Sequence, residues 1–146
     1  MPVNPIPLGF HTVTPYFVVD GADGFIAFLK KAFNATEHHI SRTPNGKVMH
    51  AQVRINDSII MLSDSMPGHG ANKPMMYLYV KDADAVFASA LAAGGKELQP
   101  MKDQFYGDRC GAVTDPCGNP WWIASHVEDV SAEQMAKRQQ EMAPKK

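Results

Sequence analysis

The sequence has few cysteines, no excess of either charge and no long apolar run, and each absence argues against a class of protein. Its only cysteines are Cys110 and Cys117. The sequence does not decide whether they form a disulfide, but two thiols do not make the disulfide framework of a small secreted domain. The net charge of −1 gives no basic surface for binding nucleic acid through its phosphates. No apolar run approaches the roughly 18 residues of a membrane-spanning helix.

What is present is typical of a globular protein. Hydrophobic residues make up 45% of the 146 residues and charged residues 20%, enough for a buried core. Residues 1–11 do not have the charged start and apolar stretch of a secretory signal. We therefore expect a cytoplasmic protein that contacts neither nucleic acid nor a membrane.

The sequence aligns with itself, without a gap, at an offset of 61 residues. This offset places Tyr16 on Tyr77 and Val19 on Val80, and it keeps the order of later features. Because an internal repeat constrains the whole architecture, the offset predicts two modules of the same fold.

Each copy shows one strand, one helix and three further strands, which predicts an α+β fold of two tandem βαβββ modules with mixed sheets enclosing a cleft. Asp20 or Asp23 is expected to cap the first helix and Asp82 the second. The expected boundaries are a single domain over 1–126, made of modules 12–64 and 75–126, and a helical tail over 127–146. Ser131 and Gln134 form a capping box at the start of that tail.

Alternation along the strands assigns each side chain to one of two faces. One face of each sheet is apolar and is expected to lie beneath the helix; in the second copy it includes Ala112 and Cys110. The other face carries polar and aromatic residues, namely His50, Gln52, Arg54, Met61, Tyr77, Tyr79, Val113, Trp122 and His126. Such a face is too polar for a dry core and too aromatic for a solvated surface. It predicts either a partly wet binding cleft or a packed dimer interface.

The repeat and three short motifs resemble the vicinal oxygen chelate superfamily, which contains glyoxalase, bleomycin-resistance and dioxygenase proteins. The motifs are VMHA at 48–51, MLSD at 61–64 and DPCGNPW at 115–121, and they look most like the PhnB-like branch. The resemblance spans Thr12 to His126. It implies the duplicated fold around a cleft and, commonly, a homodimer.

The resemblance also says where a metal ion would bind. In metal-dependent members, four cleft positions carry His, Glu or Gln, and these positions map to Thr14, Met61, Met75 and Trp122. None of these four can supply the imidazole or carboxylate ligands that such an ion needs. We therefore expect no metal and no other cofactor. A replacement site stays open, because a hairpin pairing His39 with His50 would place Glu37 on the same face.

Three functions remain open, and whether the protein is an enzyme is one of the open points. The first is a metal-free small-molecule binding protein, in which the ligand contacts Tyr16, His50, Gln52, Tyr77, Tyr79, Phe105, Arg109 and Trp122. The second is a lyase, transferase or dioxygenase-type enzyme acting on a small oxygenated or phosphonate-like metabolite, with His50 or His126 as general base. The third is a non-catalytic dimeric scaffold. Arg109 has an alternative role as a bridge to Asp103 or Asp108.

Overall fold

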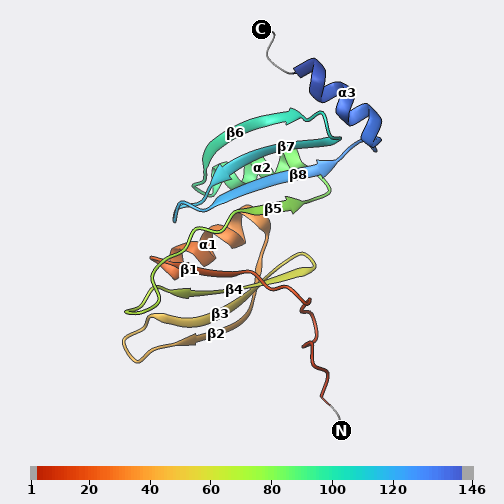
Figure 1. Ribbon diagram of the computed structural model, residues 1–146. Coiled ribbons are helices and arrows are strands. Elements are labelled where there is room, and N and C mark those ends of the chain that lie inside the picture. The colour runs from red at the N-terminus through yellow and green to blue at the C-terminus, as the bar shows by residue number, and fades with distance from the viewer. Residues whose placement is uncertain (1–2, 143–146) are drawn as a thin grey trace.

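The protein consists of two βαβββ modules followed by a third helix, as the computed structural model of residues 3–142 shows (Figure 1). The first module contains β1 (Tyr16–Val19), α1 (Ala22–Phe33), β2 (Thr36–Arg42), β3 (Val48–Ile55) and β4 (Ser58–Asp64). The second contains β5 (Met76–Tyr79), α2 (Ala83–Ala92), β6 (Lys96–Asp103), β7 (Asp108–Thr114) and β8 (Pro120–His126). The predicted α+β fold with a duplicated module is confirmed.

Both sheets have the same strand order. The first runs β1-β4-β3-β2 and the second β5-β8-β7-β6. In each sheet the first strand pairs in parallel with the last, and the other pairings are antiparallel, so both sheets are mixed. Tyr16 lies beside Met61 and Tyr77 beside Trp122, at the predicted offset.

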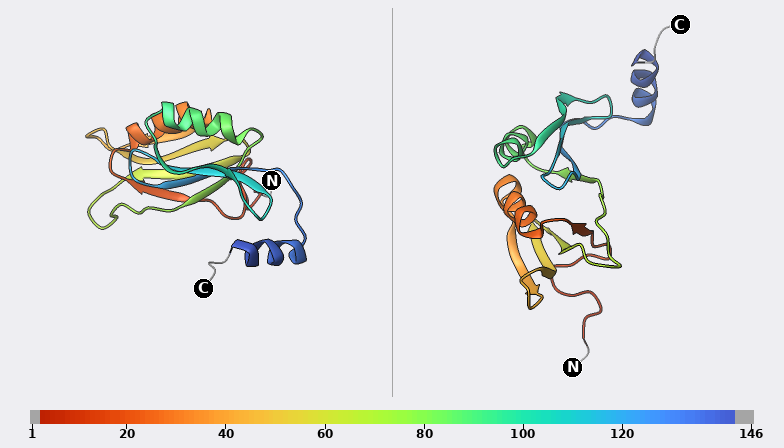
Figure 2. Two further views of the ribbon diagram at one scale, coloured as in Figure 1. Left: turned by 90° about the horizontal axis from the view of Figure 1, so that it is seen from above. Right: turned by 90° about the vertical axis from the view of Figure 1, so that its left-hand side faces the viewer.

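The two modules share one hydrophobic core. α1 and α2 lie side by side and cover the same side of both sheets (Figure 2). Trp121 of β8 is 0% exposed and stacks on Phe17 of β1, with ring centroids 5.4 Å apart. Its centroid is also 4.9 Å from that of Phe33 at the end of α1. Since a side chain of the second module packs among aromatic residues of the first, the two modules form a single packed unit.

The two helix starts are capped from the end of the last strand of their own module. Asp64 accepts hydrogen bonds from the backbone N–H of Gly21 at 3.3 Å and of Ala22 at 2.8 Å. At the equivalent position, Ser125 accepts one from Ala83 at 3.0 Å. The prediction that Asp20 or Asp23 caps α1 is therefore wrong, because the cap is a residue distant in sequence. Asp82 does cap α2, as predicted, by accepting from Ala85 at 3.1 Å.

The offset of 61 fails in β7 and in β6, which pairs with it. Ala51 pairs with Leu62, but it is Gly111, not Ala112, that pairs with Ile123. The turn between β7 and β8, residues 115–119, is one residue longer than the matching part of the first hairpin. A shift of one residue exchanges the two faces of a strand.

The predicted faces of β7 are therefore wrong. Val113 lies in the core on the helix side. Ala112 pairs with Trp122, and Cys110 pairs with Ala124, so both share the face opposite the helices. Asp108, which pairs with His126, also lies on that face.

The tail forms helix α3 (Ala132–Met142), which projects away from both sheets (Figure 2). Ser131 and Gln134 form the predicted capping box, in which the Ser131 hydroxyl accepts from the Gln134 N–H at 3.1 Å. Arg138 ties α3 to the domain through Glu128 and the Phe105 carbonyl oxygen. Among residues 3–142, no helix is long and apolar enough to cross a bilayer.

Candidate functional site

The face of each sheet opposite the helices carries the polar and aromatic residues, and we call these faces the first and second open face. The first open face includes Tyr16, His50, Gln52 and Met61. The Tyr16 hydroxyl lies 3.2 Å from His50 Nδ1, and Gln52 Nε2 lies 3.2 Å from His50 Nε2. The structure thus brings together three of the predicted ligand-binding residues in one hydrogen-bonded row across β1 and β3.

A pocket of about 530 Å³ lies over part of the first open face. Gln52 and Met61 line it from the sheet, and Thr14 lines it from the segment before β1. The N-terminal segment, with Ile6 and Phe10 among its contributions, forms the other wall. The volume is in the range of small-molecule sites, which are mostly apolar with a few polar groups. Sequence reasoning missed this segment because it has no periodic pattern.

The second open face is organised around Asp108, whose side chain is 3% exposed. Its Oδ2 accepts hydrogen bonds from the hydroxyls of Tyr77 at 2.7 Å and Tyr79 at 2.8 Å. Its Oδ1 accepts one from His126 Nδ1 at 2.9 Å. The other ring nitrogen of His126 lies 2.7 Å from a carboxylate oxygen of Asp129. Three predicted site residues therefore converge on one carboxylate.

Hydrogen bonding and burial set the charges of this cluster. Burial by itself would raise the pKa of Asp108, but hydrogen bonds from His126, Tyr77 and Tyr79 outweigh it and lower that pKa below its ordinary value. The hydrogen bond to Asp108, and then the one to Asp129, raises the pKa of His126. Burial, followed by hydrogen bonds to neighbouring groups, raises the pKa of Tyr77. At neutral pH the carboxylate is ionised and the phenols keep their protons.

Aromatic rings surround this carboxylate. The Tyr77 and Tyr79 ring centroids are 5.3 Å apart, and the Tyr77 ring stacks nearly parallel to Trp122 at 6.4 Å. The Tyr106 hydroxyl lies 3.3 Å from that of Tyr77. Both tyrosines of β5 remain partly exposed, Tyr79 at 62%. The second open face is thus an accessible aromatic surface over a buried charge.

Sequence reasoning missed Asp108 as the centre of this cluster. Asp108 was considered only as a partner for Arg109, because the offset of 61 places the residues of β7 on the wrong faces. The signal was present in the longer turn at 115–119, which shifts the register by one residue.

Two predicted ligand-binding residues, Arg109 and Phe105, belong to neither the hydrogen-bonded row through His50 nor the cluster around Asp108. The guanidinium of Arg109 is on the helix side, where it pairs with Asp84 at 2.9 Å and with Asp103 at 3.3 Å. This placement turns the Arg109 side chain away from the open face, where a ligand contact was expected. It agrees with the alternative role of Arg109 as a bridge to Asp103. Phe105 lies beside α3, and its carbonyl oxygen accepts a hydrogen bond from Arg138 at 3.1 Å.

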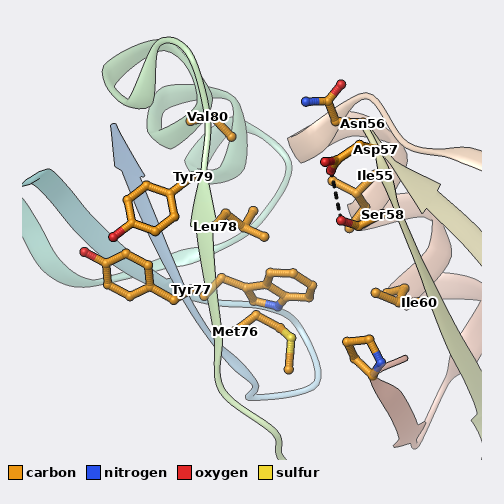
Figure 3. Close-up of a pocket in the computed structure, with 12 residues that line it drawn as sticks. Ile55, Asn56, Asp57, Ser58, Ile60, Met76, Tyr77, Leu78, Tyr79 and Val80 are labelled. Atoms are coloured by element: carbon orange, nitrogen blue, oxygen red, sulfur yellow. Dashed lines mark hydrogen bonds between the residues drawn. The ribbon is translucent and has the colours of Figure 1, made fainter. Parts of the chain in front are cut away.

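A separate groove of about 350 Å³ runs between the modules, from β5 to the turn joining β3 and β4 (Figure 3). Met76 and Leu78 of β5 point into it, toward Ile60 of β4 (Figure 3). The rings of Tyr77 and Tyr79 point to the other side of β5 (Figure 3). The groove is therefore largely apolar, with Asn56, Asp57 and Ser58 lining the end at the turn, and it opens on the other side of β5 from the two tyrosine rings.

Four positions correspond to the metal ligands of metal-dependent superfamily members, and we call them the inherited metal positions. The residues at these positions do not fit a metal ion. Met61 and Thr14 line the pocket of the first open face, Met75 is 60% exposed, and Trp122 stacks on Tyr77. A thioether, a hydroxyl and an indole lack the ligand strength of imidazole or carboxylate groups for zinc or iron. Within residues 3–142, no group of three or more His, Cys, Asp or Glu side chains is placed to hold a metal ion.

The replacement metal set does not assemble either. His39 pairs with Gln52 rather than with His50, although the two histidine ring centroids lie 6.4 Å apart. A bulge between Glu37 and His39 turns Glu37 to the other face of β2. The Glu37 carboxylate is 2.5 Å from Lys30 of α1, on the helix side of the sheet. The prediction that Glu37 shares a face with the two histidines is therefore wrong.

The two cysteines are free thiols, so the disulfide left open by the sequence does not form. Cys110 is buried on the second open face, with its sulfur 3.6 Å from the Tyr106 hydroxyl. Burial, together with Asp115, Asp20 and Asp64, raises the pKa of Cys117 to about 11. Cys117 is therefore a protonated and weakly nucleophilic thiol at neutral pH.

Comparison with known proteins gives a consistent family match. A model of the Glyoxalase/Bleomycin resistance protein/Dioxygenase superfamily matches residues 9–123. The uncharacterized protein Mb0911c of Mycobacterium bovis is 37% identical over 134 residues, covering 84% of this chain and 88% of that protein. The family model thus covers the first module and the second as far as the middle of β8.

Two solved structures show the same fold. TioX from Micromonospora sp. ML1 is 21% identical with a TM-score of 0.64, over 83% of this chain and 100% of that one. A PhnB protein from Bacillus cereus is 22% identical with a TM-score of 0.61, over 79% of this chain and 99% of that one. At this level of identity the likeness extends to the fold alone.

Proposed function

We propose that this chain, which belongs to the Glyoxalase/Bleomycin resistance protein/Dioxygenase superfamily, binds a small organic molecule in the pocket of the first open face without the help of a metal ion. The observation that carries the proposal is the pocket itself. Its volume of about 530 Å³ suits a small ligand, and its walls combine apolar residues with a few hydrogen-bonding groups such as Gln52. The match to the PhnB protein supports a place in the PhnB-like branch.

The side chains at the inherited metal positions support binding without a metal. Thr14 and Met61 stand in this pocket, where metal-dependent relatives would need imidazole or carboxylate ligands. Methionine is flexible and polarizable, and it adapts to varied apolar ligands. The pocket is thus suited to packing against a ligand rather than to polarising one through an ion.

Neither histidine candidate favours the enzyme alternative. His126 has a carboxylate oxygen beside each ring nitrogen, so both nitrogens carry protons when both hydrogen bonds form. It then has no lone pair with which to act as a base. Both ring nitrogens of His50 also have neighbours, Tyr16 and Gln52.

We infer further that the protein acts as a homodimer. Helix α3 supports this, because it projects away from both sheets and none of its residues is buried. A helix this short is stabilised in water mainly by packing against another surface, which a second copy would supply. Light scattering coupled to size-exclusion chromatography tests the inference, and a monomer across the micromolar range would contradict it.

A thermal-shift screen against aromatic, polyketide-like and phosphonate compounds tests ligand binding, with affinities then measured by calorimetry. A compound that raises the melting temperature of the wild type should bind at least 10-fold more weakly to Gln52→Leu or Met61→Glu. Glu133→Gln on α3 serves as the matched control and should bind as the wild type does. Metal analysis of protein purified without chelator should find substoichiometric metal; a stoichiometric ion lost on His50→Ala would overturn the proposal.

A further inference from the structure

The hydroxyls of Tyr77 and Tyr79 are held in one hydrogen-bonding direction. Each donates its single proton to Asp108 Oδ2, at 2.7 and 2.8 Å. A phenol has one proton, so after this donation its oxygen can only accept further hydrogen bonds. Because Asp108 is ionised and 3% exposed, it holds both protons inward. The Tyr106 hydroxyl already lies 3.3 Å from the Tyr77 oxygen, so the oxygen of the more exposed Tyr79 is the acceptor open to a ligand.

The cluster also has an excess of negative charge. Asp108 and Asp129 contribute two carboxylates, and His126 between them contributes one positive charge. The positive ring is therefore neutralised on both sides. Arg109, the neighbouring cation along β7, is turned to the helix side and paired with Asp84 and Asp103.

The exposed ring faces add attraction for the same kind of group. Tyr77 and Trp122 present nearly parallel rings, tilted by 11°, and Tyr79 lies beside them. Aromatic faces carry partial negative charge and attract cations within about 6 Å of the ring centre. They also stack against other planar groups.

From these three observations we propose that the second open face binds protonated primary amines attached to a planar, aromatic group. The ammonium group donates to the phenol oxygen of Tyr79, and the planar group packs against Trp122. This site is separate from the pocket of the first open face and does not depend on the function proposed for that pocket.

The polarity of the phenols discriminates between ligands. A carboxylate or carbonyl would present acceptors to oxygens that have no proton left to donate, and buried acceptors without donors are unfavourable. A quaternary ammonium keeps the attraction to the rings but has no N–H to donate. Primary amines should therefore bind best, quaternary amines less well and carboxylates worst.

The test uses benzylamine, benzyltrimethylammonium and phenylacetate as probes on the full chain, followed by NMR of the tryptophan indole N–H signals. Trp122→Phe assigns the signal of Trp122, since Trp121 is buried in the core. Benzylamine should shift the Trp122 signal and bind at least about 10-fold more tightly than phenylacetate. Equal affinity for the two, or equal affinity for benzylamine and benzyltrimethylammonium, would overturn the proposal.

Two variants examine the phenol oxygens directly. Tyr79→Phe keeps the ring at an exposed position and should weaken benzylamine binding about 5-fold through the lost acceptor. Asp108→Asn places an amide N–H₂ against the phenols, so that a hydroxyl can turn outward and donate. This variant should lose amine affinity and gain affinity for phenylacetate.

Variants of the first open face are the controls. Gln52→Leu and Tyr16→Phe should leave benzylamine affinity within twofold of wild type, which separates this site from the pocket of the proposed function. Loss of benzylamine binding in those variants, or an unchanged affinity in Tyr79→Phe, would contradict the assignment. Because Tyr79→Phe is conservative and exposed, its result does not depend on whether Asp108→Asn folds.

Discussion

The two modules have the same skeleton but differ in what they present on their open faces. Strand order, helix placement and the capping position at the end of the last strand repeat from one module to the other. The first open face is a row of hydrogen bonds through His50, beside a pocket. The second is a set of donors converging on Asp108. Repetition therefore preserved the packing side of each sheet and left the other side free to diverge.

The largest expected effect concerns the core that the modules share. Trp121→Ala removes a fully buried ring that packs against Phe17 and Phe33 of the first module. It should lower the free energy of unfolding by about 3–5 kcal/mol. Trp122→Ala, next in sequence but on the second open face, should lower it by only about 1 kcal/mol because the ring is not in the core. Urea denaturation measures both; equal losses would mean that the modules do not depend on a common core.

A smaller effect distinguishes the two open faces. Asp108→Ala leaves the hydroxyls of Tyr77 and Tyr79 and the ring of His126 without their common acceptor. We expect a loss of about 2–4 kcal/mol in the free energy of unfolding, typical of removing a buried charged partner. On the first open face, Gln52→Ala should lose less than about 1 kcal/mol, because its contact with His50 is only part-buried. A milder loss for Asp108→Ala than for Gln52→Ala would show that the carboxylate does not organise its face.

The two helix caps should differ by a modest amount. Asp64 accepts from the N–H groups of Ala22 and Val48, both at 2.8 Å, while Ser125 accepts from Ala83 at 3.0 Å. Asp64→Ala should destabilise the protein by about 1–2 kcal/mol and Ser125→Ala by about 0.5–1 kcal/mol. Chemical denaturation at neutral pH gives both values. The reverse order would show that charge at the helix start adds nothing to the first module.

The smallest expected effect is a pH dependence that comes from the second open face. The lowered pKa of Asp108 means that its contribution to stability is present above the ordinary value of 3.8 and is lost as pH falls through the lowered one. The raised pKa of His126 means that its contribution is present below 6.5 and is lost as pH rises through the raised one. Together these contributions are greatest between those two ordinary values.

Urea midpoints from pH 3 to pH 9 provide the measurement for this pH dependence. The wild type should lose stability above about pH 6.5, from the ordinary histidine pKa, and His126→Gln should remove most of that loss. His50→Gln, the matched change on the first open face, should leave the loss in place. If the pH profile of His126→Gln matched that of the wild type, the cluster around Asp108 would not be the cause of the pH dependence.

The amino-acid sequence by itself determined the duplicated fold. Hydrophobic periodicity, turn residues and the offset that aligns Tyr16 with Tyr77 depend on neighbours along the chain, and these signals were enough to predict both modules. Periodicity also predicted that Tyr77, Tyr79, Trp122 and His126 share one face. Local chemistry was enough here because strand alternation is a property of the backbone.

Only the tertiary structure decided which residues make the sites. A turn one residue longer at 115–119 reversed the faces of β7, bringing Asp108 to the open side and turning Arg109 to the helix side. A bulge in β2 likewise separated Glu37 from the histidines. The wall that the N-terminal segment adds to the pocket, and the cap that Asp64 adds to α1, join residues far apart in sequence. Register shifts and contacts of this kind are fixed by packing across the whole fold, so no local pattern in the chain predicts them.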